Sequence, residues 1–451
     1  MIEHIKTATL WLLICTSIIL TWMIWTYQPE YRILGESDYI EREIIGEERS
    51  LLDVIHPEKV IIHEDDQSFW LHPFEGAYEN ILNQLRRIRL DYFYSGSDVY
   101  GSSMSGIQGL EIIFPDQLQR DWIYMLFDME DSEQVLPMES VDRILLFMNN
   151  QSSQTEVSVR FVSSHNNEFY QANTGLSVNQ FKAFYNEYVD NRTEVNVYPL
   201  QTNTRNIFSK RNYVPIETMD LKRYTFLINS VEDAQEAFLQ ALFNDPELVR
   251  NYFQGNQEVY TDGNRMMNVV ENGNVLQYVH STSLTQSERS ERSIVEASID
   301  FINGHAGWTD QYKLASWSET TFNDRATFRM HVDGLPIMGT NVNRTEFYTM
   351  ELARQGSRIS EYIRPIFHLE EELHGLERTS LPSFQVVLNV IDENEAIEKE
   401  LIEDVAVGYY MRKQTSLIIF EPAWFIQERG IWRRVDIRDD LLQGSLGGGT
   451  E

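Results

Sequence analysis

An uncharged run of 20 residues, Ala8–Tyr27, lies close to the start of the chain and reads ATLWLLICTSIILTWMIWTY. A helix rises about 1.5 Å per residue, so a run of this length spans ~30 Å, the thickness of a bilayer's hydrocarbon core. Trp22, Trp25 and Tyr27 lie at its end, where aromatic side chains are enriched at membrane interfaces. The run predicts one transmembrane helix, with the rest of the chain folding in water.

Two other interpretations of this run fit less well. A cleaved signal peptide has a shorter apolar run and small residues at its cleavage site, but this run ends in Trp-Met-Ile-Trp-Thr-Tyr. A lipoprotein signal requires a small residue before the cysteine, whereas Ile14 precedes Cys15 in the middle of the run. An uncleaved anchor is the preferred interpretation.

The net charge limits the classes of partner. Lys and Arg number 37 against 69 Asp and Glu, so the formal net charge is −32. Such a chain repels phosphate backbones and anionic lipid surfaces, which argues against nucleic acid and against membrane docking through a basic patch. The single cysteine excludes an intrachain disulfide and a cysteine-based zinc site.

The distribution of charge also bears on orientation. Residues 1–32 carry two basic and two acidic side chains, so the whole negative charge belongs to residues 33–451. The positive-inside rule weakly favours a cytoplasmic N-terminus, and an acidic body without disulfides suits the outside of a Gram-positive cell. We expect a single-pass protein of the cell membrane, with a cytoplasmic stub at 1–7, a transmembrane helix at 8–27 and an extracellular bulk. A cytoplasmic body on the same anchor is the alternative.

Beyond the anchor the pattern predicts an α+β fold, a multi-domain ectodomain of antiparallel sheets with packed helices. Helical spacing of apolar residues marks 75–93, and Ser177 with Gln180 forms the capping-box pattern of a helix over 177–188. Strand-like runs occupy 110–114, 122–127, 144–147 and 157–162. These elements predict an N-terminal α+β domain over 36–205, with residues 201–212 as a linker.

A helix followed by an antiparallel hairpin recurs in the second half. Helix caps are predicted at Ser230, Ser290 and Asp392, and hairpin tips at Asn272-Gly273, Asp333-Gly334 and Arg429-Gly430, 43, 44 and 38 residues after the caps. Coincidence among common motifs is the alternative. We expect a middle helix-plus-hairpin domain over 206–285, a C-terminal α+β domain over 286–440 and a disordered tail over 441–451.

Motifs of catalysis or metal binding do not emerge from the sequence. His368 and His374 do not share a helix face, so a solvated acidic helix is expected there. Residues 63–66, HEDD, resemble half of a metal site, and the Ser-rich loop 101–106 lacks the glycine spacing of a nucleophile elbow. We therefore expect no catalytic residue, no cofactor and no metal. Core packing is preferred over interface anchoring for four tryptophans, Trp308, Trp317, Trp424 and Trp432.

Two segments resemble a known family. The first is WTYQPEY at 25–31, directly after the anchor, and the second is IEDVAVGYY at 402–410, followed by EPAW at 421–424. Both resemble the WalH (YycH) family of low-GC Gram-positive bacteria, and chain length and topology match along essentially the whole chain.

This resemblance implies a cell-surface accessory protein of the WalK/WalR two-component system, which governs cell-wall metabolism. It implies the sensor histidine kinase WalK and the single-anchor protein WalI (YycI) as partners, a C-terminal region related in fold to WalI, and no catalytic residues. The favoured function is a non-enzymatic regulator of a membrane histidine kinase, acting through helix and ectodomain contacts. A surface-anchored protein that binds or hydrolyses wall polymer is the alternative.

The anchor itself carries a candidate contact face. At 100° per residue, a set of small, hydroxyl and leucine side chains falls within an arc of roughly 140°, opposite Trp11, Trp22 and Trp25. The set consists of Thr9, Leu13, Thr16, Ser17, Leu20 and Thr21. Small and hydroxyl residues let a second helix approach closely, so we predict that this face contacts a partner helix. The alternative is that the hydroxyls only bond their own backbone four residues back.

Overall fold

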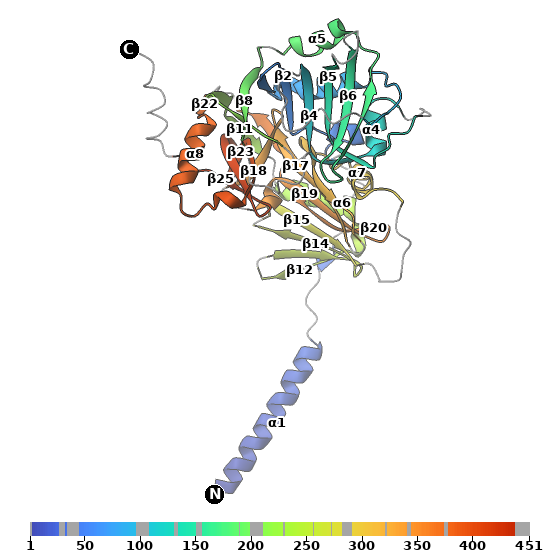
Figure 1. Ribbon diagram of the computed structural model, residues 1–451. Helices are drawn as coiled ribbons and strands as arrows, with labels where there is room; N and C mark the ends of the chain where they lie inside the picture. Colours follow the sequence, from blue (N-terminus) through green and yellow to red (C-terminus); the bar gives the residue numbers. More distant parts are fainter. Residues whose placement is uncertain are drawn as a thin grey trace.

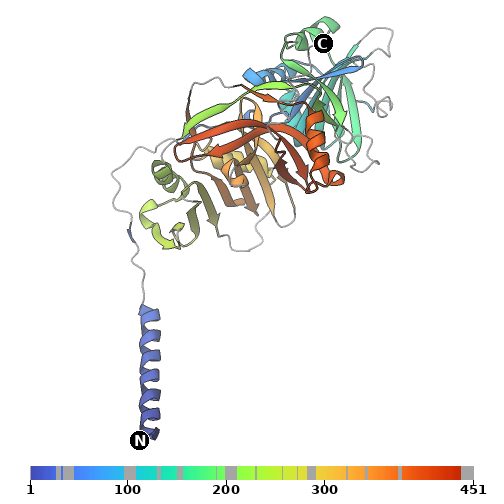
Figure 2. The same ribbon diagram turned by 90° about the vertical axis from the view of Figure 1, so that its left-hand side faces the viewer.

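Helix α1 (Ile2–Thr26) projects away from a body of sheets and helices in two perpendicular views of the computed structural model (Figures 1 and 2). The structure describes residues 2–26, 32–33, 45–95, 108–129, 134–149, 156–188, 190–198, 211–228, 231–255, 257–271, 273–281, 291–320, 323–340, 344–373 and 378–437. Several predicted features lie outside these ranges: the caps Ser230 and Ser290, Asn272, His374, the loop 101–106 and the tail 441–451.

The N-terminal sheet has eight antiparallel strands in the order β7-β6-β5-β4-β2-β3-β8-β9. Its strands are β2 (Lys59–Glu64), β3 (Gln67–Leu71), β4 (Gly109–Gln119), β5 (Ser140–Asn149), β6 (Glu156–Ser163), β7 (Glu168–Asn173), β8 (Arg192–Tyr198) and β9 (Asn212–Pro215). The helices of this half are α2 (Leu51–Val54), α3 (Ala77–Leu85), α4 (Arg120–Leu126) and α5 (Val178–Asn186). The first six residues of β4 are all buried, so both faces of the sheet are covered at its centre.

The C-terminal sheet follows the path β1-β12-β13-β14-β15-β20-β19-β17-β18-β23-β24-β11-β21, with β16 beside β17 and β25 beside β24. Its strands are β1 (Arg32–Ile33), β11 (Tyr224–Ile228), β12 (Arg250–Gln254), β13 (Gln257–Thr261), β14 (Arg265–Val270), β15 (Val275–His280), β16 (Tyr312–Ser318), β17 (Asp324–Val332), β18 (Leu335–Thr340), β19 (Thr349–Gln355), β20 (Arg358–Pro365), β21 (Leu369–Glu372), β23 (Ile402–Lys413), β24 (Leu417–Glu428) and β25 (Ile431–Arg434). A separate pair joins β10 (Met219–Lys222) and β22 (Arg378–Leu381). The helices of this half are α6 (Val231–Leu242), α7 (Ile294–Asn303) and α8 (Phe384–Glu393).

The chain changes direction at the turn between β17 and β18. Asp333 and Gly334 both have left-handed backbones, with φ of 47° and 77°, and only two residue pairs join the two strands. Beyond the turn β18 pairs in parallel with β23, whereas the other strand pairings of the C-terminal sheet are antiparallel. The turn therefore links the antiparallel strands around β17 to the hairpin of β23 and β24, through β18.

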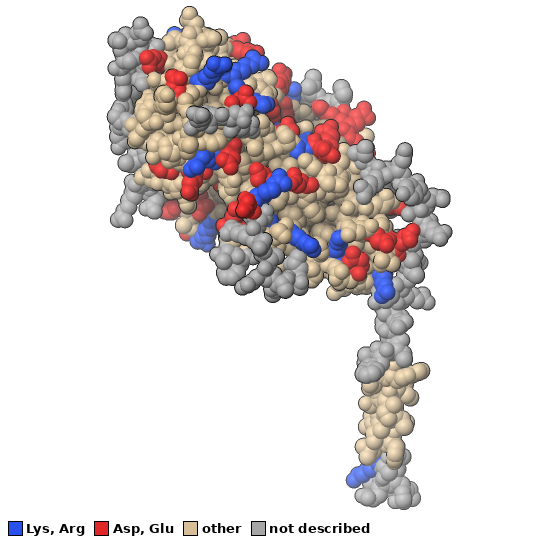
Figure 3. Space-filling model, turned by 90° about the vertical axis from the view of Figure 1, so that its right-hand side faces the viewer, with Lys and Arg blue, Asp and Glu red and all other residues tan. Residues whose placement is uncertain are grey.

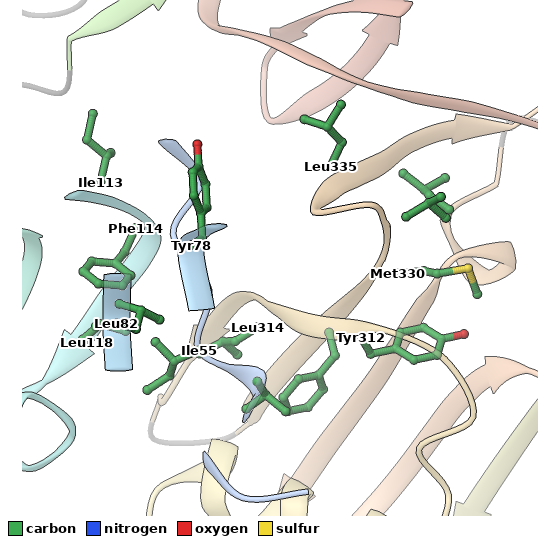
Figure 4. Close-up of a cluster of buried hydrophobic side chains, with 14 of the residues drawn as sticks. Ile55, Tyr78, Leu82, Ile113, Phe114, Leu118, Tyr312, Leu314, Met330 and Leu335 are labelled. Atoms are coloured by element: carbon green, nitrogen blue, oxygen red, sulfur yellow. The ribbon is translucent and has the colours of Figure 1, made fainter. Parts of the chain in front are cut away.

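The two sheets share one hydrophobic core. Figure 4 shows Ile55, Tyr78 and Leu82 of the N-terminal half beside Leu314 and other side chains of the C-terminal half. All of the residues labelled in that view are buried. Because the same cluster includes residues from both sheets, the halves are packed on each other rather than tethered by a linker.

The α+β class and several elements are confirmed. Ser177 N donates to Gln180 Oε1 at 2.9 Å and Gln180 N donates to Ser177 Oγ at 3.3 Å, which is the predicted capping box at the start of α5. Gly273, Gly334 and Gly430 occupy left-handed hairpin turns. Trp308 and Trp424 are 1% exposed and belong to the core, whereas Trp317 and Trp432 are partly exposed.

Other predictions were wrong for identifiable reasons. Residues 122–126 belong to α4 and Phe127 is its C-cap, so the strand predicted over 122–127 was wrong, because an unbroken apolar run does not distinguish a strand from a helix. Asp392 lies in the last turn of α8, which begins after Ser383, so it caps nothing. Leu369–Glu372, expected in a solvated helix, form the exposed strand β21. The helix expected over 75–93 ends at Leu85, although Ile88 beyond it is buried.

Helix α6 and helix α7 are each followed by antiparallel strands, as expected, but the predicted spacing between cap and turn was wrong. Helix α6 is followed by the meander β12–β15, and Gly273 joins the third and fourth of these strands. After α7, the cap is Ser293 and the corresponding strands are β16, β17, β19 and β20, so Gly334 follows the second strand. The near-equal cap-to-tip distances therefore compare different positions. Strand β15 pairs with β20, so the predicted middle and C-terminal segments contribute to one sheet, and their division into domains stays a prediction.

Candidate functional site

The predicted contact face lies on α1, where every residue from Leu10 to Trp22 is exposed. In Figure 3 this stretch shows no basic or acidic side chain, whereas both kinds are scattered over the body. Leu13 is 60% exposed and Leu20 54% exposed, so neither packs against the body. Their side chains are available to a second helix.

Two hydroxyls of this face, those of Thr16 and Thr21, bond the helix's own backbone. Thr16 Oγ1 donates to the carbonyl of Leu12 at 2.9 Å, and Thr21 Oγ1 donates to the carbonyl of Ser17 at 2.8 Å. Each hydroxyl keeps acceptor capacity, so these bonds leave a contact with a partner helix open. The side chain of Thr9 lies outside those described. The contact face of Thr9, Leu13, Thr16, Ser17, Leu20 and Thr21 stays a prediction.

Within the residues that the structure describes, none of the helices meets the combined requirement of length and apolarity for crossing a membrane.

A second candidate site, which the sequence did not predict, is a cavity of about 310 Å³ between the two sheets. The N-terminal half contributes residues 56–59, Trp70 and Tyr213. The C-terminal half contributes side chains of β16, β17, β18, β23, β24 and β25. The cavity therefore lies on the shared interface of the two halves, a usual position for a ligand site.

Two histidines face each other in this cavity. The rings of His56 and His331 are 5.3 Å apart, and His331 Nδ1 lies 3.0 Å from the carbonyl of Arg329. His56 is 3% exposed; its Nδ1 lies 3.4 Å from Glu79 Oε1, and its Nε2 makes no hydrogen bond. Burial is the largest influence on both imidazoles and lowers the pKa of each. For His56 the Glu79 carboxylate opposes this effect, whereas for His331 the charges of Lys313 and Arg329 add to it, so both imidazoles are neutral at neutral pH.

Two buried lysines connect the halves across the cavity. Lys59 on β2 donates from Nζ to the carbonyl of Val405 on β23 at 3.1 Å. Lys313 on β16 donates from Nζ to the carbonyl of Asp53 at 3.0 Å and to Glu79 Oε1 at 3.2 Å. Both lysines are 7% exposed. A buried ammonium needs such partners, so these contacts fix the relative position of the sheets.

The HEDD segment belongs to a different buried cluster. His63 Nε2 lies 2.9 Å from Glu111 Oε2, Tyr213 OH donates to the same oxygen at 2.7 Å, and Arg143 donates to Glu111 Oε1 at 3.3 Å. Burial raises the pKa of Glu111, but the hydrogen bond and charge of His63, with Arg143 and Tyr213, outweigh it and lower that pKa to about 2. Among the residues that the structure describes, no three or more His, Cys, Asp or Glu side chains are arranged to hold a metal ion.

The sequence contained a weak signal for the cavity that motif reasoning missed. Lys59 and Lys313 begin apolar strand segments, KVII and KLA, and Arg329 and His331 alternate with buried apolar residues along β17. Charged residues at such positions indicate either a sheet face open to solvent or a buried polar site. Only the packing of the two halves decides between them.

Comparison with known proteins gives a consistent match. Residues 3–189 match the family model for the YycH protein, N-terminal domain, and residues 209–441 match the model for the YycH protein, C-terminal domain. The two-component system WalR/WalK regulatory protein YycH of Bacillus subtilis (strain 168) is 23% identical over 465 residues, which cover 98% of this chain and 97% of that protein.

The fold is also similar to a solved structure. The crystal structure of YycH from Bacillus subtilis superposes with a TM-score of 0.68 at 18% identity, covering 88% of this chain and 99% of that chain. Since the two family models together span most of the sequence, the chain belongs to the YycH family.

Proposed function

We propose that this protein is a non-enzymatic, membrane-anchored regulator of the sensor histidine kinase WalK, with WalI as a companion, in a system that controls cell-wall metabolism. The support for a two-component role is membership of the YycH family and a full-length relative named as a WalR/WalK regulatory protein. Localisation at the cell membrane, with the N-terminus in the cytoplasm and the bulk outside, is part of the proposal. It rests on the uncharged run at 8–27 and the acidic body.

The observation that carries the mechanism is the exposure of α1. Every residue from Leu10 to Trp22 is exposed, and the helix projects from the body (Figures 1 and 2). In the proposed topology this exposed helix lies in the bilayer, within reach of the helices of a membrane kinase. We therefore infer that regulation passes through helix contacts, aided by contacts of the body with its partners.

The predicted face supplies modest energy for such a contact. A hydrogen bond between helices in a membrane contributes about 0.6 kcal/mol on average and up to ~2 kcal/mol. Several of them, together with close packing of small residues, bias the arrangement of a kinase's helices without binding tightly alone. A weak, distributed contact suits a regulator that shifts an equilibrium between kinase states.

The test replaces the hydroxyl face while keeping the helix apolar. The variant Thr16→Leu/Ser17→Leu/Thr21→Leu is compared with Trp11→Leu/Trp22→Leu, which changes the opposite side. At equal protein level, we expect the first variant to lose co-purification with WalK from membranes and to alter kinase-dependent transcription, and the second to behave as wild type. If both behave as wild type while deletion of the body abolishes regulation, the helix is only an anchor.

A further inference from the structure

The cavity between the sheets contains a cation without a counter-ion. Arg329, on β17, lines the cavity, and it forms no ion pair or side-chain hydrogen bond with any residue that the structure describes; its Nε is buried without a partner. Burial is the main influence on this guanidinium and lowers its pKa, and Glu58 and Tyr348 act on it only through their fields. The chain has 69 acidic residues, so carboxylates are not scarce. Arg329 lacks an ion-pair partner because of where the fold places it.

The remaining charges around the cavity are better matched. Lys313 pairs with Glu79 at 3.2 Å, and Lys59 Nζ lies 3.9 Å from Glu58 Oε1 and bonds a carbonyl. Three cations and two carboxylates line the cavity, the carboxylates being Glu58 and Asp404. Counting Glu79, three carboxylates stand against the three cations, but none of the three carboxylates forms an ion pair with Arg329.

His56 adds a second polar group without a partner. Its side chain is 2% exposed, it lines the same cavity, and its Nε2 makes no hydrogen bond. A buried polar atom without a partner destabilises the folded state, so proteins generally keep such atoms hydrogen-bonded. Arg329 Nε and His56 Nε2 therefore lie in the walls of one cavity without a hydrogen-bond partner there, and a bound ligand could supply one.

We propose that this cavity binds a small molecule carrying a carboxylate or phosphate group, with Arg329 and His56 as the donors to its oxygens. A guanidinium presents parallel N–H groups that match a carboxylate or phosphate in two-point contact. A volume of about 310 Å³ admits a small metabolite or the end of a larger one, not a polymer strand. Because the walls belong to both halves of the body, a bound anion bridges them and strengthens their packing.

The test uses the full-length protein purified in a nonionic detergent. Inorganic phosphate and acetate are titrated separately through the millimolar range, with sodium chloride at matched ionic strength as the reference. We expect one or both anions to raise the thermal midpoint in a saturable manner, because a ligand that binds only the folded state stabilises it. The two anions distinguish a phosphate site from a carboxylate site.

The variant Arg329→Gln is compared with Arg325→Gln, which removes the same charge from the same strand at an exposed position paired with Glu361. We expect Arg329→Gln to weaken anion binding roughly tenfold or more, and Arg325→Gln to bind as wild type. Without anion, Arg329→Gln keeps or raises the thermal midpoint, because it removes a partly buried charge that has no counter-ion in contact. His56→Asn weakens binding as well.

Three results overturn the proposal: no saturable stabilisation by either anion, equal anion binding by wild type and Arg329→Gln, or a large drop in the midpoint of Arg329→Gln without anion. The last would mean that the guanidinium has a structural role. Each of these results leaves the proposed regulation through α1 unaffected, since that rests on a different part of the chain.

Discussion

Replacing Gly334 by alanine tests how closely the two halves are packed. Gly334 has φ +77°, and an added Cβ would lie 2.6 Å from Pro73 Cβ and 2.7 Å from Pro73 O, on the N-terminal half. Gly430 is the matched control, because it has φ +76° in a hairpin turn and nothing within 4 Å of an added Cβ. Both variants place alanine in the left-handed region, but only one places a methyl group in the interface.

The magnitudes follow from these contacts. The left-handed backbone costs an alanine about 1–2 kcal/mol at either position. Carbon atoms pack at about 3.5–4.0 Å, so the new methyl at Gly334 must displace Pro73 or the turn, and overpacking of this kind costs about 1–3 kcal/mol more. We expect Gly334→Ala to lower the free energy of unfolding by about 2–5 kcal/mol, and Gly430→Ala by about 1–2 kcal/mol.

The assay is urea unfolding of the full-length protein in detergent, followed by tryptophan fluorescence. Hydrogen exchange adds a local measurement, since only Gly334→Ala is expected to speed exchange around Pro73 and the Asp333 turn, where Tyr224 OH donates to Asp333 Oδ2 at 2.6 Å. Equal destabilisation by the two variants would refute the close approach of the halves at this turn.

Three further predictions concern acid stability and topology. The pKa of Glu111 is lowered from 4.5 to about 2 in the folded protein. Its carboxylate therefore contributes about 3 kcal/mol to the free energy of unfolding above pH 4.5, and this contribution is lost as the pH falls toward 2. Glu111→Gln should flatten the acid-unfolding profile in that window and destabilise the protein at pH 7. The pKa of His305 is lowered from 6.5 to about 3, mainly by burial and then by the charge of Arg364. Below pH 6.5 the unfolded chain therefore binds a proton at this imidazole that the folded chain does not bind, so stability falls as the pH drops. His305→Gln should reduce that slope between pH 6.5 and 4, as measured by urea midpoints, and an unchanged slope would contradict the buried neutral imidazole. External protease added to protoplasts should digest residues 33–451, whereas complete protection would contradict an extracellular body.

Local signals in the sequence predicted the elements whose chemistry is self-contained. The Ser177–Gln180 capping box is made by residues three apart, and the left-handed turns at Gly273, Gly334 and Gly430 depend on glycine's freedom at positive φ. These features need no distant partner. Sequence reasoning therefore located α5 and the hairpin tips correctly.

Elements decided by packing were less predictable. Residues 122–127 are apolar throughout, and only their burial beside β4 and β5 makes them the helix α4. At Asp392 the capping pattern predicted the start of a helix, whereas the apolar spacing of Phe384, Val387 and Ile391 indicated a helix that was already under way. All three apolar residues are buried in α8. The apolar spacing was the stronger signal, because it reports which face the core covers.

The cavity could not be predicted because its walls come from distant parts of the chain. Its polar groups include His56 and Lys59 near the start, Arg329 in the middle and Asp404 toward the end. No spacing rule links such residues. By contrast, the candidate face on α1 follows from helical geometry alone, which is why the sequence proposes it.

The central claim is that one face of α1 contacts a helix of the sensor kinase, and cross-linking tests it most directly. The chain's single cysteine, Cys15, serves as a built-in control, because about 100° per residue places it on the side of Trp11, away from Ser17. A cysteine is placed instead at position 17 in a Cys15→Ser background, and both proteins are cross-linked in membranes to WalK carrying one cysteine in a transmembrane helix. A contact through this face should give a cross-linked product from Ser17→Cys and little from Cys15. Equal yields from both positions, or no product from Ser17→Cys with any transmembrane cysteine of the kinase, would contradict it.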